Sequence, residues 1–152
     1  MSRDAFACPL TKGEKILVAL DGSIYSEYAI DQAISLGDKC NSMIYLISVI
    51  DLYPEQMAVA AELTEKMSSE ARELLDAGKE KVEKANLACE TIVRMGGQVH
   101  QLIIQEAKER DIDLIVMGTH GKSGLKGLFM GSVAQKVIGQ APCPVLVVPT
   151  LK

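Results

Sequence analysis

Short apolar runs alternate along the chain with longer stretches in which apolar residues recur at helical spacing. Apolar runs of strand length, with few charges, indicate strands that are buried on both faces of a sheet. They cover residues 15–20, 43–50, 89–94, 113–117 and 144–148. The intervening stretches carry apolar residues three or four positions apart, which predicts amphipathic helices. These helices are expected over residues 24–38, 58–85, 98–110 and 132–140.

The predicted order of strand and helix repeats regularly and ends on a strand. Such an order is typical of a three-layer α/β fold, in which helices cover both faces of a parallel sheet. The chain has 152 residues, the size of one domain. We expect that domain to cover residues 14–152, after an N-terminal arm over residues 1–13 that reads as loose. In sheets of this kind, ligands bind beyond the carboxyl ends of the strands.

Two helices carry more specific signals. Ser23 follows the first strand and is expected to cap the helix after it. In the long helix, an apolar stripe from Leu63 through Met67 to Ala85 is expected to face the core. Glu62 and Lys66, which are four residues apart, are expected on the outer surface of that helix.

Composition and charge exclude several classes of function. Hydrophobic residues make up 48% of the chain and there is no Trp, so the core must consist mainly of aliphatic side chains. A net charge of −4 argues against binding to nucleic acid or to an anionic membrane, because both need a basic surface. No apolar run is long enough to span a membrane, and the N-terminus lacks the apolar core of a secretory signal. We therefore expect a cytoplasmic protein.

The cysteines do not have the spacing of metal ligands. Cys8, Cys40, Cys89 and Cys143 lie far apart and include no C-x-x-C pair. We expect all of them to be reduced, as is usual in the cytoplasm. Cys143 stands between two prolines and is expected to be a small packed residue.

A glycine-rich stretch follows the strand at 113–117 and leads into the helix at 132–140. It is not a Walker A loop, because Val116 stands where that motif needs glycine, and its glycines do not fit G-x-G-x-x-G. Glycines nevertheless let a backbone approach a ligand closely, and the first amides of a helix favour an anion. Lys122 and Lys126 add positive charge. These features are typical of a phosphate site.

A structural explanation of the same stretch stays open. Ser132 and Gln135 have the spacing of a capping box, which would explain the serine without any ligand. The glycines could form turns only. His120 is expected to be a loop residue near the entrance of the site, and His100 to lie on the surface of its helix.

With its flanking sequences, the motif resembles the universal stress protein family. Gly118-Thr-His-Gly121, nine further residues and then Gly131-Ser132 match the nucleotide motif of the ATP-binding branch. The resemblance covers about residues 14–149 and extends to the strand that precedes Asp21. It implies a five-stranded parallel sheet in the order 3-2-1-4-5, with the Rossmann-like fold of the adenine nucleotide alpha hydrolases.

The resemblance also implies a set of nucleotide contacts. The backbone of Val49 would meet adenine, and Asp21 would bind ribose hydroxyls or approach Mg²⁺ or Mn²⁺ on the phosphates of ATP. Asp21 could instead be a turn or cap residue only. The chain departs from many relatives in having Ala19-Leu20, rather than Pro-Thr, before Asp21. The full set of expected nucleotide-binding residues is Ala19, Asp21, Val49, Met117, Gly118, Gly121, Lys122, Gly131, Ser132 and Val133.

Three hypotheses about function follow. The first is an ATP-binding regulatory module in the stress response, which acts through an unknown protein partner and forms a homodimer along the strand at 144–148. The second is a slow ATPase or an enzyme that phosphorylates itself, for example at Ser132. The third is a nucleotide-free interaction protein. The sequence shows no catalytic constellation, so it favours binding over catalysis.

Overall fold

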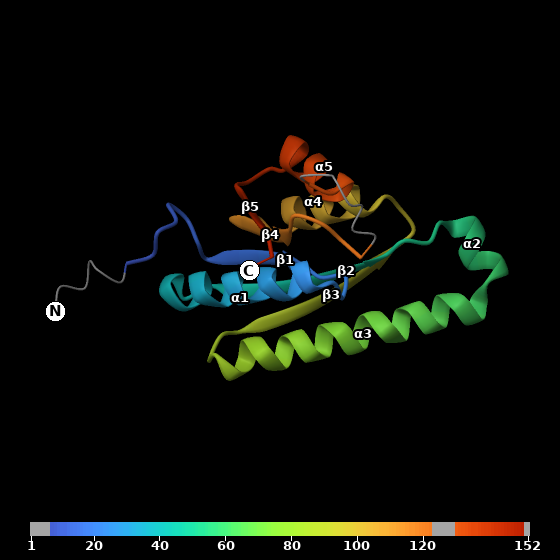
Figure 1. The fold of residues 1–152 in the computed structure, drawn as a ribbon, viewed down its shortest axis with the longest axis horizontal. Helices are drawn as coiled ribbons and strands as arrows, with labels where there is room; N and C mark the ends of the chain where they lie inside the picture. The colour runs from blue at the N-terminus through green and yellow to red at the C-terminus, as the bar shows by residue number, and fades with distance from the viewer. Residues whose placement is uncertain (1–6, 123–129, 151–152) are drawn as a thin grey trace.

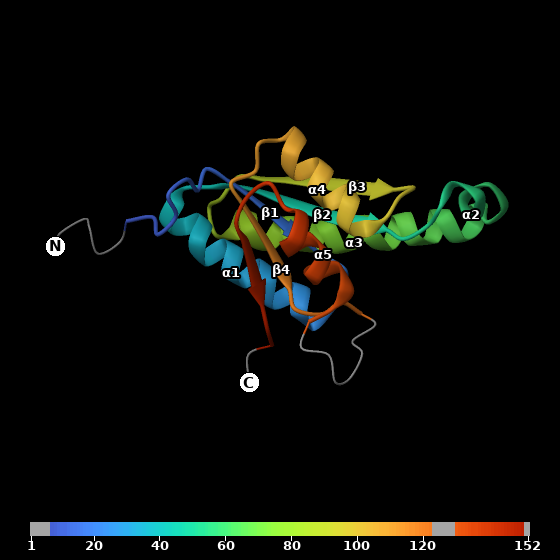
Figure 2. The same ribbon diagram turned by 90° about the horizontal axis from the view of Figure 1, so that it is seen from above.

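The computed structural model describes residues 7–122 and 130–150, which form a three-layer α/β fold (Figure 1). All strand pairs in it are parallel, and the sheet order is β3-β2-β1-β4-β5. The predicted fold class and strand order are therefore confirmed. Figure 2 shows β3 and β5 toward opposite edges of the sheet. The strands are β1 (Lys15–Ala19), β2 (Met43–Ile50), β3 (Cys89–Met95), β4 (Leu114–Gly118) and β5 (Val145–Val148).

Helices cover both faces of this sheet. On one face, α1 (Ile24–Cys40) and α3 (Ala61–Lys84) pack against the strands, and on the other face lie α4 (Val99–Glu109) and α5 (Ser132–Gln140) (Figure 1). A short helix, α2 (Pro54–Val59), precedes α3. None of the helices in the described ranges is long and apolar enough to cross a membrane.

The core forms because neighbouring residues of a strand point to opposite faces. Ile16 and Val18 of β1 join the cluster under α1 and α3, whereas Leu17 between them joins the cluster under α4 and α5. All three side chains are fully buried. The central strands are thus apolar on both faces, which explains their continuous apolar runs in the sequence.

The helix expected over residues 58–85 is interrupted. Its backbone breaks at Ala60, with φ −132° and ψ 56°, and a separate short helix, α2, begins at Pro54, four residues before the predicted start. Gln56 accepts a hydrogen bond from the backbone N–H of Tyr53 and so stabilises the start of α2. Ser23 does cap α1, as predicted, because its side chain accepts a hydrogen bond from the backbone N–H of Ser26.

The N-terminal arm is fastened to the domain over residues 7–13. A disulfide joins Cys8 to Cys40 at the end of α1, Leu10 packs on the core, and Lys12 forms an ion pair with Asp113. The prediction of a loose arm is therefore wrong for these residues, and residues 1–6 lie outside the described ranges. The prediction that all the cysteines are reduced is also wrong, because contacts of the folded chain bring Cys8 and Cys40 together.

The other two cysteines are free thiols. Cys143 packs against the core under α4 and α5, as expected, and burial raises its pKa. Burial likewise raises the pKa of Cys89 to about 11. Since the thiolate is the reactive form, neither residue resembles a reactive cysteine.

His100 is buried, although it was predicted on the surface. It lies in the first turn of α4, on the same side of the sheet as α5. Burial lowers the pKa of its imidazole first, and the nearby charge of Lys136 lowers it further. The sequence pattern missed this because a polar residue was assigned to the exposed face of the helix.

Candidate functional site

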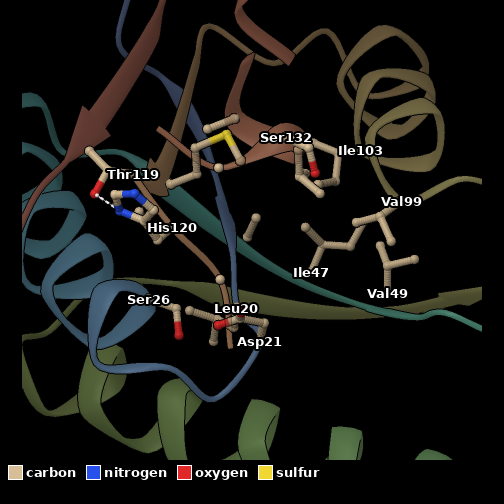
Figure 3. A pocket seen from close by; sticks show the side chains of 17 residues that line it. Leu20, Asp21, Ser26, Ile47, Val49, Val99, Ile103, Thr119, His120 and Ser132 are labelled. Atoms are coloured by element: carbon tan, nitrogen blue, oxygen red, sulfur yellow. Dashed lines mark hydrogen bonds between the residues drawn. The ribbon is translucent and has the colours of Figure 1, made fainter. Parts of the chain in front are cut away.

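A crevice opens at the carboxyl ends of the central strands, where the connections from β1 and β4 diverge. β1 continues into α1 on one face of the sheet, and β4 leads toward α5 on the other. This is the switch point at which open α/β sheets bind ligands. Figure 3 shows the side chains around the crevice, which come from β1, β2, β4, α1, α4, α5 and the loop after β4.

Nine of the ten residues expected to bind a nucleotide line this crevice. They are Ala19, Asp21, Val49, Met117, Gly118, Gly121, Gly131, Ser132 and Val133. The tenth, Lys122, is exposed beside it, with its side chain close to Gly22. Lys126, which was expected to add positive charge, lies outside the described residues.

Asp21 connects the two strand ends that form the crevice. Its Oδ1 accepts a hydrogen bond from the backbone N–H of Ser23 at 2.9 Å. Its Oδ2 accepts one from the backbone N–H of Lys122, also at 2.9 Å. The residue therefore does more than form a local turn, because it holds the start of the glycine loop against the end of β1. Each oxygen keeps a second lone pair for another partner.

The glycines at the start of the loop are required by close packing, because a side chain at either position would clash with a neighbouring residue. A Cβ atom on Gly118 would lie 2.4 Å from the Cβ of Tyr25, so only glycine lets α1 approach the end of β4 this closely. A Cβ on Gly121 would lie 2.7 Å from Oδ2 of Asp21. Both positions need glycine for reasons that the sequence could not show, since the partners come from a segment about a hundred residues away in the chain.

Gly131 closes the loop against its own beginning. Its backbone N–H donates to the carbonyl oxygen of Thr119, and a Cβ would lie 3.3 Å from that oxygen. Gly131 is also the N-cap residue of α5. The N-terminus of α5 is thereby placed directly beside the end of β4.

The capping box that could have explained Ser132 without a ligand is not formed. Ser132 is the first residue of α5 rather than its cap, and the side chain of Gln135 donates instead to the carbonyl oxygen of Met130. Ser132 is exposed at the rim of the crevice (Figure 3). The first backbone N–H groups of a helix have no partner within the helix, so this end of α5 presents donors and a positive dipole to an anion.

Apolar side chains from three elements form the opposite wall. Ile47 and Val49 of β2 lie close to Val99 and Ile103 of α4 (Figure 3). Met117 of β4 also lines the crevice. Sequence reasoning found Val49 and Met117 but missed the other three. Their signal was present, because Ile47 is two positions from Val49 on a strand and Ile103 is four positions from Val99 on a helix.

The backbone of β2 is exposed to this crevice at Val49. Pairing between β1 and β2 ends at Ala19 and Ile47, and the last hydrogen bond runs from the N–H of Leu20 to the carbonyl of Ile47. Val49 lies two residues further along and directs its N–H and C=O to the same side as Ile47. No residue of β1 pairs with it within the described chain, so these groups face the crevice.

His120 lies in the wall of the crevice, in the loop after β4. Its Nδ1 is 3.0 Å from the hydroxyl of Thr119, and its ring is 5.1 Å from that of Tyr25 (Figure 3). These contacts orient the imidazole beside the glycine loop. Within the described ranges, no group of three or more His, Cys, Asp or Glu side chains could form a metal site by itself.

Comparison with known proteins identifies the family. The universal stress protein family matches residues 13–149. The chain belongs to this family. It is 38% identical to universal stress protein Sll1388 of Synechocystis over 88% of this chain and 96% of that protein. It is 36% identical to universal stress protein MJ0531 of Methanocaldococcus jannaschii over 89% of this chain and 81% of that protein.

Solved structures, several of them universal stress proteins, have the same architecture. UspA of Lactobacillus plantarum has a TM-score of 0.82 at 24% identity and covers 91% of this chain and 99% of its own. MJ0577, a test case of structural genomics, has a TM-score of 0.81 at 29% identity over 91% of this chain and 97% of its own. More distant members were solved in complex with dAMP, from Archaeoglobus fulgidus, and with cAMP, at 21% and 22% identity and TM-scores of 0.65 and 0.67. These two cover 91% and 93% of this chain and 99% and 100% of their own.

Proposed function

We propose that this universal stress protein binds ATP in the crevice and acts as a nucleotide-dependent regulatory module. One observation carries the proposal. At a single switch point, the crevice joins an apolar wall and an unpaired strand backbone to a glycine loop that ends at the N-terminus of α5. The first two features suit a purine base, and the third suits phosphate groups.

The apolar wall of the crevice would hold the adenine base. The base would lie between the side chains of Ile47, Val99 and Met117. The N–H and C=O of Val49 offer one donor and one acceptor to its edge, matching the acceptor and donor that adenine presents. Adenine nucleotides are also the ligands seen in the dAMP and cAMP complexes of two proteins with this fold, which makes them the first compounds to test.

The polar side of the crevice would bind the phosphate groups. The first amides of α5, at Ser132 and Val133, provide donors at the rim of the crevice. Lys122 provides an exposed positive charge close to Gly22, just after β1. Gly131 lets the phosphates approach the backbone without obstruction by a side chain.

A divalent cation fits the site with the nucleotide. Mg²⁺ is usually held by one or two carboxylates together with substrate phosphates, and among the described residues Asp21 provides the carboxylate in the crevice lining. Its oxygens have lone pairs left beyond the two backbone hydrogen bonds. When bound, Mg²⁺ or Mn²⁺ would neutralise phosphate charge. Asp21 itself would orient the ion and hold the loop.

Calorimetry with ATP, ADP and AMP in the presence of Mg²⁺ tests the proposal. We expect saturable binding of ATP, and its loss in Gly131→Val, because a side chain there has only 3.3 Å to the carbonyl of Thr119. Gly139→Ala is the matched control, because a Cβ at that position meets no atom within 4 Å. Absence of ATP binding, with no nucleotide released from denatured protein, would instead support a nucleotide-free interaction protein.

Incubation with γ-labelled ATP and Mg²⁺ separates binding from catalysis. We expect ATP to remain intact over the time of the binding experiment. Steady release of phosphate would reveal an ATPase, and label on the protein, mapped to Ser132 or a neighbour, would reveal self-phosphorylation.

We also propose a homodimer formed along β5. This strand lies at the edge of the sheet, so one side of its backbone is open to pairing. Light scattering during size-exclusion chromatography tests this, and a monomer at high micromolar concentration would contradict it.

The proposed site of action is the cytoplasm, where ATP is produced. The Cys8–Cys40 disulfide argues in the other direction, because the cytoplasm keeps most thiols reduced. Cell fractionation would show whether the protein is in the cytoplasm or in a more oxidising compartment.

A further inference from the structure

The start of α3 and the whole of α2 extend beyond the sheet that the rest of α3 covers. With 24 residues, α3 is about 36 Å long, whereas the eight residues of β2 span about 26 Å. The first buried residue of α3 is Ser68, and α2 has no buried residue. Figure 1 shows α2 beyond the ends of β2 and β3. The apolar stripe predicted for this helix therefore continues past the core it was expected to face.

Apolar side chains are consequently exposed at this end of the molecule. Val59 is 86% exposed, Leu63 47% and Tyr53 44%, and these are three of the five large hydrophobic residues exposed in the described chain. Met57 and Met67 lie half-buried on the small cluster around Ile50 and Leu52. We call Tyr53, Met57, Val59, Leu63 and Met67 the α2–α3 apolar patch.

The segment that carries this patch is strongly acidic. Residues 51–76 contain seven acidic and two basic side chains, giving −5, whereas the whole chain has a net charge of −4. All seven carboxylates are exposed, and within the described chain none takes part in an ion pair. Lys66 does not pair with Glu62, although it follows four residues later. These charges are Asp51, Glu55, Glu62, Glu65, Glu70, Glu73 and Asp76.

We propose that the α2–α3 apolar patch binds a basic amphipathic helix of a partner protein. The apolar face of such a helix would cover Val59 and Leu63, and its lysines and arginines would meet the exposed carboxylates of residues 51–76. Flexible methionines at the base of the patch suit a surface that adapts to the side chains of a partner.

The charge distribution argues against two other occupants. If a second copy of this chain covered the patch, two segments with a net charge of −5 each would lie at short range and repel one another. An anionic membrane would be repelled in the same way. A basic helix is the occupant for which both the apolar residues and the charges are favourable. This inference is independent of nucleotide binding, because none of the five patch residues lines the crevice.

Fluorescence anisotropy with a labelled probe peptide tests the proposal. The probe is an amphipathic leucine–lysine helix about 18 residues long, or five turns. A leucine–glutamate helix of the same pattern is the matched control peptide. We expect the basic peptide to bind saturably and with less affinity as salt rises, and the acidic peptide not to bind.

Variants locate the binding and separate its two components. Val59→Ser with Leu63→Ser removes apolar contact without changing charge, and should weaken binding about tenfold or more. Glu62→Gln with Glu65→Gln should weaken binding and reduce its salt dependence. Ile138→Ser is the control, because Ile138 is equally exposed at 47% but lies on α5. Circular dichroism verifies that each variant is folded.

Methyl NMR of the methionines gives a direct map. Addition of the basic peptide should shift the signals of Met57 and Met67 and leave that of Met117 in the crevice unchanged. Three results would overturn the proposal: no binding of the basic peptide, equal binding by the serine variant, or self-association of the wild-type protein that the serine variant abolishes.

Discussion

The carboxylate of Asp21 accepts a hydrogen bond from the backbone N–H of Lys122, which lies 101 residues further along the chain. The same carboxylate accepts a second hydrogen bond from the backbone of Ser23. Asp21 therefore joins the ends of two neighbouring strands, β1 and β4, and holds the first turn of the glycine loop. This one side chain thus links the two strand ends that border the crevice.

Replacing Asp21 with Ala should release the start of the loop. The backbone N–H of Lys122 loses its acceptor, and we expect faster hydrogen exchange at that amide and ATP binding weakened by about 1–3 kcal/mol. Asp21→Asn retains one carbonyl oxygen and should lie between the two. Hydrogen exchange and calorimetry are the measurements. Unchanged protection of Lys122 in Asp21→Ala would show that Asp21 does not hold the loop.

Gly118→Ala should destabilise the fold, whether or not a nucleotide binds. The added Cβ meets the Cβ of Tyr25 at 2.4 Å and its backbone carbonyl carbon at 3.0 Å, so α1 must move away from β4. A cost of about 1–3 kcal/mol in the free energy of unfolding is expected. Gly139→Ala in α5 is the matched control and should be neutral or stabilising by up to about 1 kcal/mol. Urea denaturation measures both, and equal stabilities of the two variants would refute this account of Gly118.

Cys40→Ser should lower stability only under oxidising conditions. The disulfide to Cys8 closes a loop of the unfolded chain, and its loss should cost about 2–4 kcal/mol. Thermal unfolding of the wild-type protein and the variant, with and without a reductant, is the measurement. Cys89→Ser is the control, because Cys89 is a free thiol whose replacement should have the same effect in both conditions. A reductant that leaves the wild-type protein equally stable would argue against the disulfide.

His100 should make the protein less stable in mild acid. Burial, followed by the charge of Lys136, lowers the pKa of its imidazole in the folded state. The unfolded chain, with an ordinary histidine pKa of about 6.5, then binds the proton more readily. Stability is therefore fully present above that pH and is lost as pH falls through the lower folded-state pKa. Urea denaturation from about pH 7 to pH 5 should show this decline. His100→Gln should flatten it, and an identical pH dependence in both proteins would contradict the assignment.

The sequence predicted the fold well because the strands of a covered parallel sheet carry a strong local signal. Leu17 and its neighbours Ile16 and Val18 had to be apolar, whichever face each one occupied. Predictions failed where a residue's environment depends on another element. His100 was assigned to solvent from the helix pattern alone, and the long helix was predicted to be continuous because the break at Ala60 has no glycine or proline to mark it.

For the candidate site, the sequence by itself determined the glycine spacing, the anion-favouring start of α5 and the presence of an aspartate after β1. These features follow from local chemistry and chain order. Only the tertiary structure decided what each residue touches. Gly118 is required by Tyr25, Gly121 by Asp21, and the N-cap of α5 is Gly131 rather than Ser132. The tertiary structure also decided that Cys8 pairs with Cys40 and that Leu63 is exposed beyond the sheet. Both depend on where separate elements end in space, and no local sequence pattern contains that information.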